Sequence, residues 1–272
     1  MAHFDWYQAS VDCPPRVMVD ALMSLPGAHD IEHGKGRLNY RESCTILSEG
    51  RDVLATVLHG GSNKLLNTVG TGENAQAVAE LLRSTWPDAH RVTRLDTAQD
   101  VRTDFPTAHA ALQLIASLRG IKGRSIIPDD PAEGATYYIG AATSPTQLRL
   151  YEKGKQLAKA AGTTEGFDLG AVRFEAQLRP VREGRIMAAK LTANEAWGST
   201  EWLLTIARQH LAIAPSPVVM HRRLPTNTER SRRMFLRQYG PFILRWISDC
   251  DSPAGFGEML SKKLSGSTSC PD

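Results

Sequence analysis

The stretch TYYIGAATSPTQLRLYEKGKQ, Thr136–Gln156, and the run VRFEAQLRP that follows it at Val172–Pro180 decide the fold. Both are short, rich in β-branched and aromatic residues, and bounded by Gly, Pro and Ser, which is typical of strands and turns. Ser144, Pro145 and Thr146 supply the expected turn. Three strands are therefore predicted here: Thr136–Ala142, Gln147–Lys153 and Ala171–Arg179.

Alternation along these strands separates an apolar face from a polar one, because successive side chains of a strand point to opposite sides. Leucines form the apolar face of the second strand, and Val172, Phe174, Ala176 and Leu178 form that of the third. A polar face of this kind is either a solvated outer surface or a binding surface, and two such strands in succession favour the second. The polar residues are Gln147, Arg149, Tyr151 and Lys153, followed by Arg173, Glu175, Gln177 and Arg179.

An earlier run, RVTRLDTAQD at Arg91–Asp100, adds a third polar face. If it is extended throughout, Val92, Arg94, Asp96, Ala98 and Asp100 share one side. Asp96 and Glu175 then lie on separate strands and could converge on a divalent cation, Mg²⁺ or Mn²⁺, since hard cations take carboxylate and phosphate oxygens. The alternative is that both carboxylates simply pair with Arg94 and Arg173 or their neighbours.

The ordered set RVTRLD, IPDDPAEGATYYIGAATSPTQLRLYEKGK and VRFEAQLRP resembles the Rep_trans family of replication initiators. This family comprises rolling-circle initiators of some plasmids and filamentous phages, with relatives among conjugative-element relaxases. The similarity spans roughly Phe4 to Arg179. It implies a sequence-specific protein that binds an origin, a hairpin or single-stranded DNA, with a host helicase as a further partner. It also implies metal-dependent nicking, in which a tyrosine becomes linked to the 5′ phosphate.

The chain departs from the family pattern after the RFE strand. Plasmid members carry the nucleophilic tyrosine shortly after that strand, whereas Pro180–Trp197 contains none. Tyr151 is the first candidate nucleophile, because Arg149 and Lys153 share its face and could hold the phosphate. Tyr138 and Tyr239 are the reserves.

Three functions stay open on these grounds. The first is a nicking initiator with Asp96, Glu175, Tyr151 and Lys153 as catalytic residues. The second is a catalytically silent origin-binding or regulatory protein of the same fold, and the third is a metal-dependent nuclease that uses water. The residues expected to contact DNA are all arginines: Arg94, Arg149, Arg173, Arg179, Arg230, Arg233 and Arg237.

The rhythm of strands and helices predicts an α+β fold, a ferredoxin-like antiparallel sheet or sheets with helices on one face. Amphipathic helices are expected at Glu73–Trp86 and Phe105–Leu118. The domain expectation is a DNA-binding and nicking domain over residues 1–180, with two possible sheet units at about 1–90 and 91–180. A helical C-terminal region over 181–264 and a flexible tail over 265–272 complete it.

The C-terminal region begins with a capping box at Thr192, which predicts one helix to about Leu211. Residues 214–217, APSP, read as a linker. A later helix carries Arg230, Arg233 and Arg237 opposite an aromatic stripe and is predicted to kink or split at Gly240-Pro241. It is interpreted either as a solvated basic helix or as one that follows DNA phosphates.

Composition limits these interpretations. The net charge of the 272-residue chain is only +3, so the case for nucleic acid depends on where charge lies rather than on its total. The four cysteines are scattered and are expected to be reduced thiols of a cytoplasmic protein. The N-terminus lacks the pattern of a signal peptide, and no apolar run approaches the roughly 20 residues of a membrane span.

Overall fold

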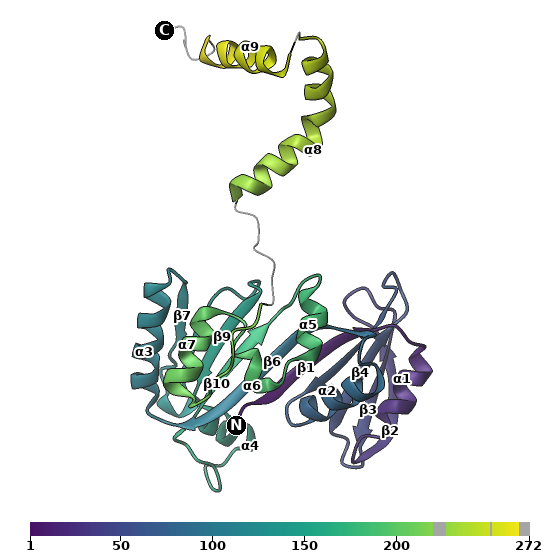
Figure 1. Ribbon diagram of the computed structural model, residues 1–272. Coiled ribbons are helices and arrows are strands. Elements are labelled where there is room, and N and C mark those ends of the chain that lie inside the picture. Colours follow the sequence, from purple (N-terminus) through teal and green to yellow (C-terminus); the bar gives the residue numbers. More distant parts are fainter. Residues whose placement is uncertain (220–226, 251, 267–272) are drawn as a thin grey trace. The chain divides into compact units, whose positions relative to one another are not determined.

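The computed structural model describes residues 1–219, 227–250 and 252–266. The chain divides into two compact units, Met1–His221 and Arg222–Asp272 (Figure 1). The first unit contains all ten strands, and the second contains two helices, α8 (Asn227–Ser248) and α9 (Pro253–Gly266). None of the helices in the described ranges has both the length and the hydropathy that crossing a membrane requires.

A single antiparallel sheet of ten strands forms the first unit, in the order β2-β3-β4-β5-β1-β6-β10-β9-β8-β7. The two expected sheet units are thus the two halves of one sheet, joined where β1 pairs with β6. The strands are β1 (His3–Val11), β2 (Ala28–Lys35), β3 (Glu42–Ser48), β4 (Val53–His59), β5 (Leu66–Thr71), β6 (His90–Arg102), β7 (Gly123–Ile126), β8 (Thr136–Ile139), β9 (Thr146–Tyr151) and β10 (Ala171–Leu178).

Helices cover one face of this sheet, as the sequence predicts (Figure 1). Arg83 of α2 donates to the carbonyl of Ala189 at 2.9 Å, and Thr97 of β6 donates to the carbonyl of Ala193 at 2.7 Å, so both halves are covered from the same side. The helices of this unit are α1 (Pro15–Leu22), α2 (Asn74–Thr85), α3 (Phe105–Leu118), α4 (Lys153–Ala161), α5 (Gly184–Lys190), α6 (Ala193–Ala196) and α7 (Glu201–His210), with a 3₁₀ turn at Pro131–Glu133.

The helix expected from Thr192 to Leu211 is two helices, α6 and α7, separated near Gly198. A Cβ at Gly198 would lie 2.0 Å from the carbonyl oxygen of Ser216, so only glycine allows that segment to pass there. Val218 donates its N–H to the Gly198 carbonyl at 2.8 Å. The expected linker at residues 214–217 therefore packs against the domain, with Pro215 buried.

The first compact unit also ends later than the boundary expected near residue 180. Helices α5 to α7 contribute Ala188, Trp197 and Ile206 to the core under the sheet, so the compact unit continues to His221. In the second unit, α8 runs through Pro241 as one helix rather than splitting. Helix α9 continues to Gly266, two residues into the expected tail, and residues 267–272 lie outside the described part.

Two irregularities in β1 and β6 change which side chains share a face. Gln8 pairs with Arg94 and Ala9 with Val92, which leaves Thr93 as an extra residue. This bulge turns Val92 into the core, away from Arg94, and corrects the expected uniform alternation. A second register shift, between Phe4 and Trp6, leaves Asp5 as the extra residue of β1. Phe4 and Tyr7 therefore both lie in the core, and Asp5 does not share their face.

The close approach of α2 to the sheet generates a stability prediction. A Cβ at Gly70 of β5 would lie 2.7 Å from the Cβ of Val78 in α2. We expect Gly70→Ala to lower the free energy of unfolding by about 1–3 kcal/mol, because the helix must shift outward. Urea unfolding followed by circular dichroism measures it. Gly50→Ala, where the nearest atom is a side-chain oxygen at 3.4 Å, is the matched control; equal midpoints for both variants would contradict the packing argument.

Candidate nucleic-acid interface

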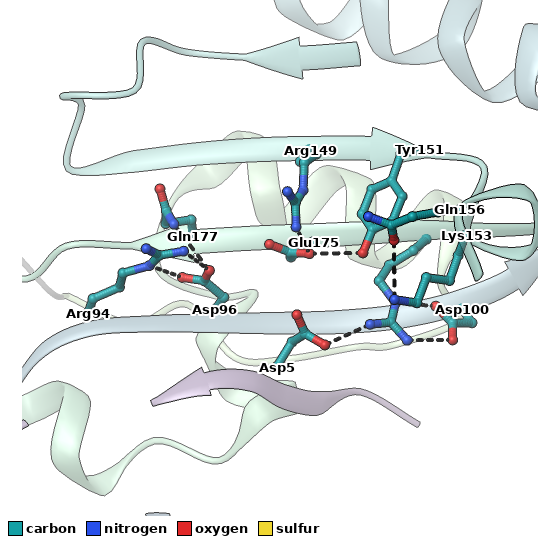
Figure 2. Close-up of polar contacts among 11 residues, drawn as sticks. Asp5, Arg94, Asp96, Asp100, Arg149, Tyr151, Lys153, Gln156, Glu175 and Gln177 are labelled. Atoms are coloured by element: carbon teal, nitrogen blue, oxygen red, sulfur yellow. Dashed lines mark hydrogen bonds and ion pairs between the residues drawn. The ribbon is translucent and has the colours of Figure 1, made fainter. Parts of the chain in front are cut away.

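The face of the sheet opposite α1–α3 and α5–α7 carries the polar side chains that the sequence singled out. We call it the polar face, defined by Trp6, Asp96, Arg149, Arg173 and Glu175. Four strands contribute, since Trp6 opposes Asp96, Asp96 opposes Gln177, and Glu175 opposes Arg149 across the register. Three ion-pair clusters lie along it (Figure 2).

The first cluster is centred on Asp96 of β6. Arg94 binds both carboxylate oxygens, Nε to Oδ1 at 3.0 Å and Nη2 to Oδ2 at 2.5 Å. Gln177 of β10 adds a third donor to Oδ2 at 3.1 Å. The Asp96 side chain is 2% exposed and that of Arg94 is 29% exposed, so the arginine covers the carboxylate and presents its outer edge to solvent. Such a bidentate pair is geometrically specific as well as strong.

The second cluster joins β9 to β10. Arg149 Nη2 lies 2.6 Å from Glu175 Oε2, and the Tyr151 hydroxyl donates to the same oxygen at 3.3 Å. Burial raises the pKa of Glu175; the Arg149 charge opposes this, and the nearby Asp96 and Asp5 carboxylates add to it. Burial likewise raises the pKa of Tyr151, and the Glu175 charge raises it further, so the phenol holds its proton at neutral pH.

The third cluster is centred on Arg173 of β10, which joins three strands. Its Nε and Nη2 donate to Asp100 of β6 at 2.5 and 2.8 Å, and its Nη1 donates to Asp5 of β1 at 2.7 Å. The side chain is 9% exposed. Burial raises the pKa of Asp100, but the Arg173 hydrogen bonds and charge outweigh it, and the net shift is downward.

Lys153 reaches this end of the polar face from a helix rather than from a strand. The structure places it as the first residue of α4, which corrects the strand expected to run through it. Its ammonium lies 5.9 Å from the centre of the Tyr151 ring and 3.2 Å from Gln156 Oε1. Burial and the Arg173 charge lower its pKa. Tyr151 is only 4% exposed, although it lies on the polar face.

Aromatic rings alternate with cations across the polar face. The Arg94 guanidinium lies 4.1 Å from the centre of the Trp6 ring, and that of Arg149 lies 4.7 Å from Tyr151. At the β8 edge, Arg124 lies 5.0 Å from Tyr138. The distances are those of cation–π pairs, which hold both partners in fixed positions.

The structure brings together most of the predicted site residues. Asp96, Glu175, Tyr151, Lys153, Arg94, Arg149 and Arg173 all lie in or beside the three clusters, and Arg179 follows β10 and donates to the Ser144 carbonyl at 3.4 Å. Glu175 pairs with Arg149 rather than with Arg173, which binds Asp5 and Asp100.

Other predicted residues lie elsewhere. Arg233 and Arg237 are exposed on α8 in the second unit, and Tyr239 is half-exposed there. Arg230 is in the same helix, with its side chain outside the described part. Tyr137 is buried in the core, whereas Tyr138 is on the polar face directly across from Arg149.

Sequence reasoning missed Asp5 and Trp6. Regular alternation in β1 places Asp5 with Tyr7, and the register shift after Phe4 reverses that. A carboxylate two residues from a buried tyrosine is a weak signal, because a one-residue shift in the strand decides which face it joins.

The polar face offers two candidate metal ligands, Asp96 and Glu175. Their carboxylate chemistry suits Mg²⁺ or Mn²⁺, which take one or two protein carboxylates together with substrate phosphate. Both carboxylates are held by arginines. Within the described residues no three His, Cys, Asp or Glu side chains are arranged to hold an ion. A cation here would need Arg94 and Arg149 to turn away from the carboxylates and toward phosphate.

The chain matches no known family model, and no curated protein matches it. Among solved structures it is similar to a rolling-circle replication initiator protein from Geobacillus stearothermophilus, with a TM-score of 0.52 and 18% sequence identity. The match covers 88% of this chain and 95% of that one. At this identity the likeness shows only that the two chains share a fold.

The Arg173 cluster generates a pH prediction. Because the pKa of Asp100 is lowered in the folded state, its contribution to stability is present above its unfolded value of about 3.8 and is lost as the pH falls through the folded pKa. Arg173→Met removes this contribution. We expect the variant to be less stable than wild type at pH 7, with the difference narrowing below about pH 4.

Urea midpoints measured between pH 7 and pH 3 test this. Arg102→Met is the control, since Arg102 forms an exposed pair with Asp168 at 3.8 Å and should change stability little. A difference between wild type and Arg173→Met that is constant over this pH range would show that Asp100 is not the linked group.

Proposed function

We propose that this protein is a DNA-binding replication initiator of the rolling-circle type, which acts in the cytoplasm and nicks one DNA strand at the polar face. The observation that carries the proposal is the alternation of aromatic rings and arginines across that face, on a fold similar to that of a rolling-circle initiator. Single-stranded nucleic acid is bound by such combinations, since bases stack on rings and phosphates pair with cations.

Two arginines of the polar face are best suited to hold phosphate. Arg124 is exposed beside Tyr138, and Arg179 donates to a neutral backbone carbonyl. Burial and the Arg94 charge lower the pKa of Arg179, so an added anion there relieves repulsion between the two cations. Arg149 also fits, because its side chain is 35% exposed although Nη2 is paired with Glu175. Removing Arg124 or Arg179 leaves no buried carboxylate behind.

Nicking is proposed to use a tyrosine of the same face. The Tyr151 hydroxyl donates to Glu175 Oε2, so this oxygen can accept the phenol proton as the tyrosine oxygen attacks phosphorus, and Oε1 is the oxygen that a bound cation would take. The bond from phosphorus to the 3′ oxygen breaks, that oxygen takes a proton from water, the hydroxide left behind is neutralised by the proton on Glu175, and the 5′ phosphate stays on the tyrosine.

Access distinguishes the two candidate nucleophiles. Tyr151 is 4% exposed, with Arg149 4.7 Å and Lys153 5.9 Å from its ring centre, so side chains around it must move before a phosphate can reach it. Tyr138 is half-buried and lies opposite Arg149, so it needs no such movement. Tyr151 is hydrogen-bonded to the proposed base, Glu175, whereas Tyr138 is the more accessible to a phosphate.

A binding-only function is the second candidate. The segment Pro180–Trp197, which follows the RFE strand, contains no tyrosine and forms α5 and α6 on the helical side of the sheet. A protein that kept the polar face and lost a nucleophile at that position would bind an origin without cutting it. The test below separates the two.

We expect DNA binding to depend on Arg124 and Arg179. The double variant Arg124→Ala, Arg179→Ala should weaken binding to a single-stranded 30-mer and reduce the salt slope of log K by about 1.4, about 0.7 for each lost phosphate contact. Fluorescence anisotropy at several salt concentrations measures this. Arg16→Ala on α1, 93% exposed on the helical side, is the control. If the double variant binds DNA with unchanged affinity, the polar face is not the DNA-binding surface.

We expect a covalent protein–DNA adduct with origin DNA and Mg²⁺ or Mn²⁺. Tyr151→Phe should abolish it while sparing DNA binding, since only the nucleophilic oxygen is lost; denaturing gels resolve the adduct. If Tyr138→Phe abolishes it instead, the accessible phenol is the nucleophile. An adduct that survives in both variants and in Tyr239→Phe contradicts the assignment. If wild type cuts the DNA but forms no adduct, water is the nucleophile. If wild type leaves the DNA intact, the binding-only function is the one supported.

We propose that Asp96 and Glu175 hold the cation, which when bound would neutralise charge on the reacting phosphate. Asp96→Asn should remove the heat of Mn²⁺ binding in calorimetry with single-stranded DNA present. Because Asp96 is buried, the fold of the Asp96→Asn variant must first be checked by circular dichroism. Asp168→Asn, on a half-exposed side chain, is the control. Equal heats for wild type and Asp96→Asn would exclude this site.

A further inference from the structure

The N-terminal half of the sheet has a hollow on the same side as the polar face. Its volume is about 410 Å³, and strands β2 to β5 line it. Lys35 and Arg37 stand at its rim, both exposed, and neither forms an ion pair within the described part of the chain. Thr45, Thr56 and Thr71 line it as hydroxyl donors and acceptors, beside apolar side chains such as Leu58.

This hollow is continuous with the polar face through the register of the sheet. One cross-strand row runs Thr45, Thr56, Val69, Gln8, Arg94. It starts in the hollow and ends at the arginine that covers Asp96. Four inter-strand steps of about 4.8 Å make this path about 19 Å long. A parallel row takes Thr71 of the hollow to Trp6 and then to Asp96.

Trp6 stands where the hollow meets the polar face. Its ring packs under the Arg94 guanidinium at 4.1 Å, and its indole N–H donates to Gln8 at 3.3 Å, so it is held in place and half-exposed. An unpaired base can stack on such a ring, whereas the bases of a duplex are already stacked on one another. Cations at the rim and hydroxyls on the floor suit the phosphates and sugars of the same strand.

We infer that the hollow is a second DNA subsite, which holds a segment of the same single strand whose reacting phosphate lies at Arg149, beside Tyr151. The inference rests on the proposed function and names its substrate class: a single-stranded segment long enough to cross from β10 to β3. Lys35 and Arg37 bind its backbone, and Trp6 stacks a base between the two subsites.

Affinity for oligonucleotides of two lengths tests this. Lys35→Ala with Arg37→Ala should lower the affinity for a thymidine 16-mer about tenfold at low salt and reduce its salt slope by about 1.4. A thymidine 4-mer spans only the polar face, so its affinity should not change. Arg16→Ala with Lys190→Ala removes two cations from the helical side and is the matched control.

The outcomes separate the inference from the proposed function. Equal loss for both lengths, or no loss for either, overturns the second subsite while leaving DNA binding in place. If the Lys35→Ala, Arg37→Ala variant loses affinity only for a duplex hairpin, the claim that the hollow binds single-stranded DNA is overturned. Absence of any DNA binding by wild type overturns the proposed function itself.

Cross-linking gives a second readout that does not depend on the affinity of the 4-mer. Ultraviolet cross-linking of the 16-mer to wild type should label peptides within residues 35–45 or 53–58 as well as those of β9 and β10. Labels confined to β9 and β10 would overturn the inference.

Discussion

The buried guanidinium of Arg173 is the interaction on which the polar face depends. From β10 it reaches carboxylates on β6 and β1, so one side chain ties together three strands that are far apart in sequence. Those strands include β1 and β6, where the two halves of the sheet join. An arginine can do this because its planar fork offers several donors at fixed angles and remains charged when buried.

The same physics explains why the polar face combines dense charge with low exposure. A buried carboxylate is costly unless it is paired, and Asp96 and Glu175 each have an arginine partner; the buried Arg173 is in turn paired with the more exposed Asp100. The pairs hold the arginines in place and leave Arg94 and Arg149 partly exposed to solvent. A surface of this kind has positive groups in fixed positions without a large net charge, which agrees with a total of only +3.

Much of the fold was predictable, because the alternation of apolar and polar residues along the chain indicates strands and their faces. Leu148 and Leu150 lie in the core with Phe174, as their spacing predicts, and Arg149, Tyr151 and Glu175 lie together on the opposite side. The errors occur where a single residue changes the pattern. Thr93 bulges and turns Val92 inward, Gly198 ends a helix early, and Lys153 starts a helix where a strand was expected to continue.

In β9 and β10 the sequence by itself determined which side chains share a face, since a regular strand repeats every two residues, whereas the bulges in β1 and β6 were not predictable from it. It could not determine which strands are neighbours or in what register. Only the tertiary structure assigned Glu175 to Arg149, brought Asp5 to Arg173, and aligned the threonines of β3 and β4 with Arg94. The reason is that cross-strand partners lie tens of residues apart in the chain, so their pairing depends on the packing of the whole sheet.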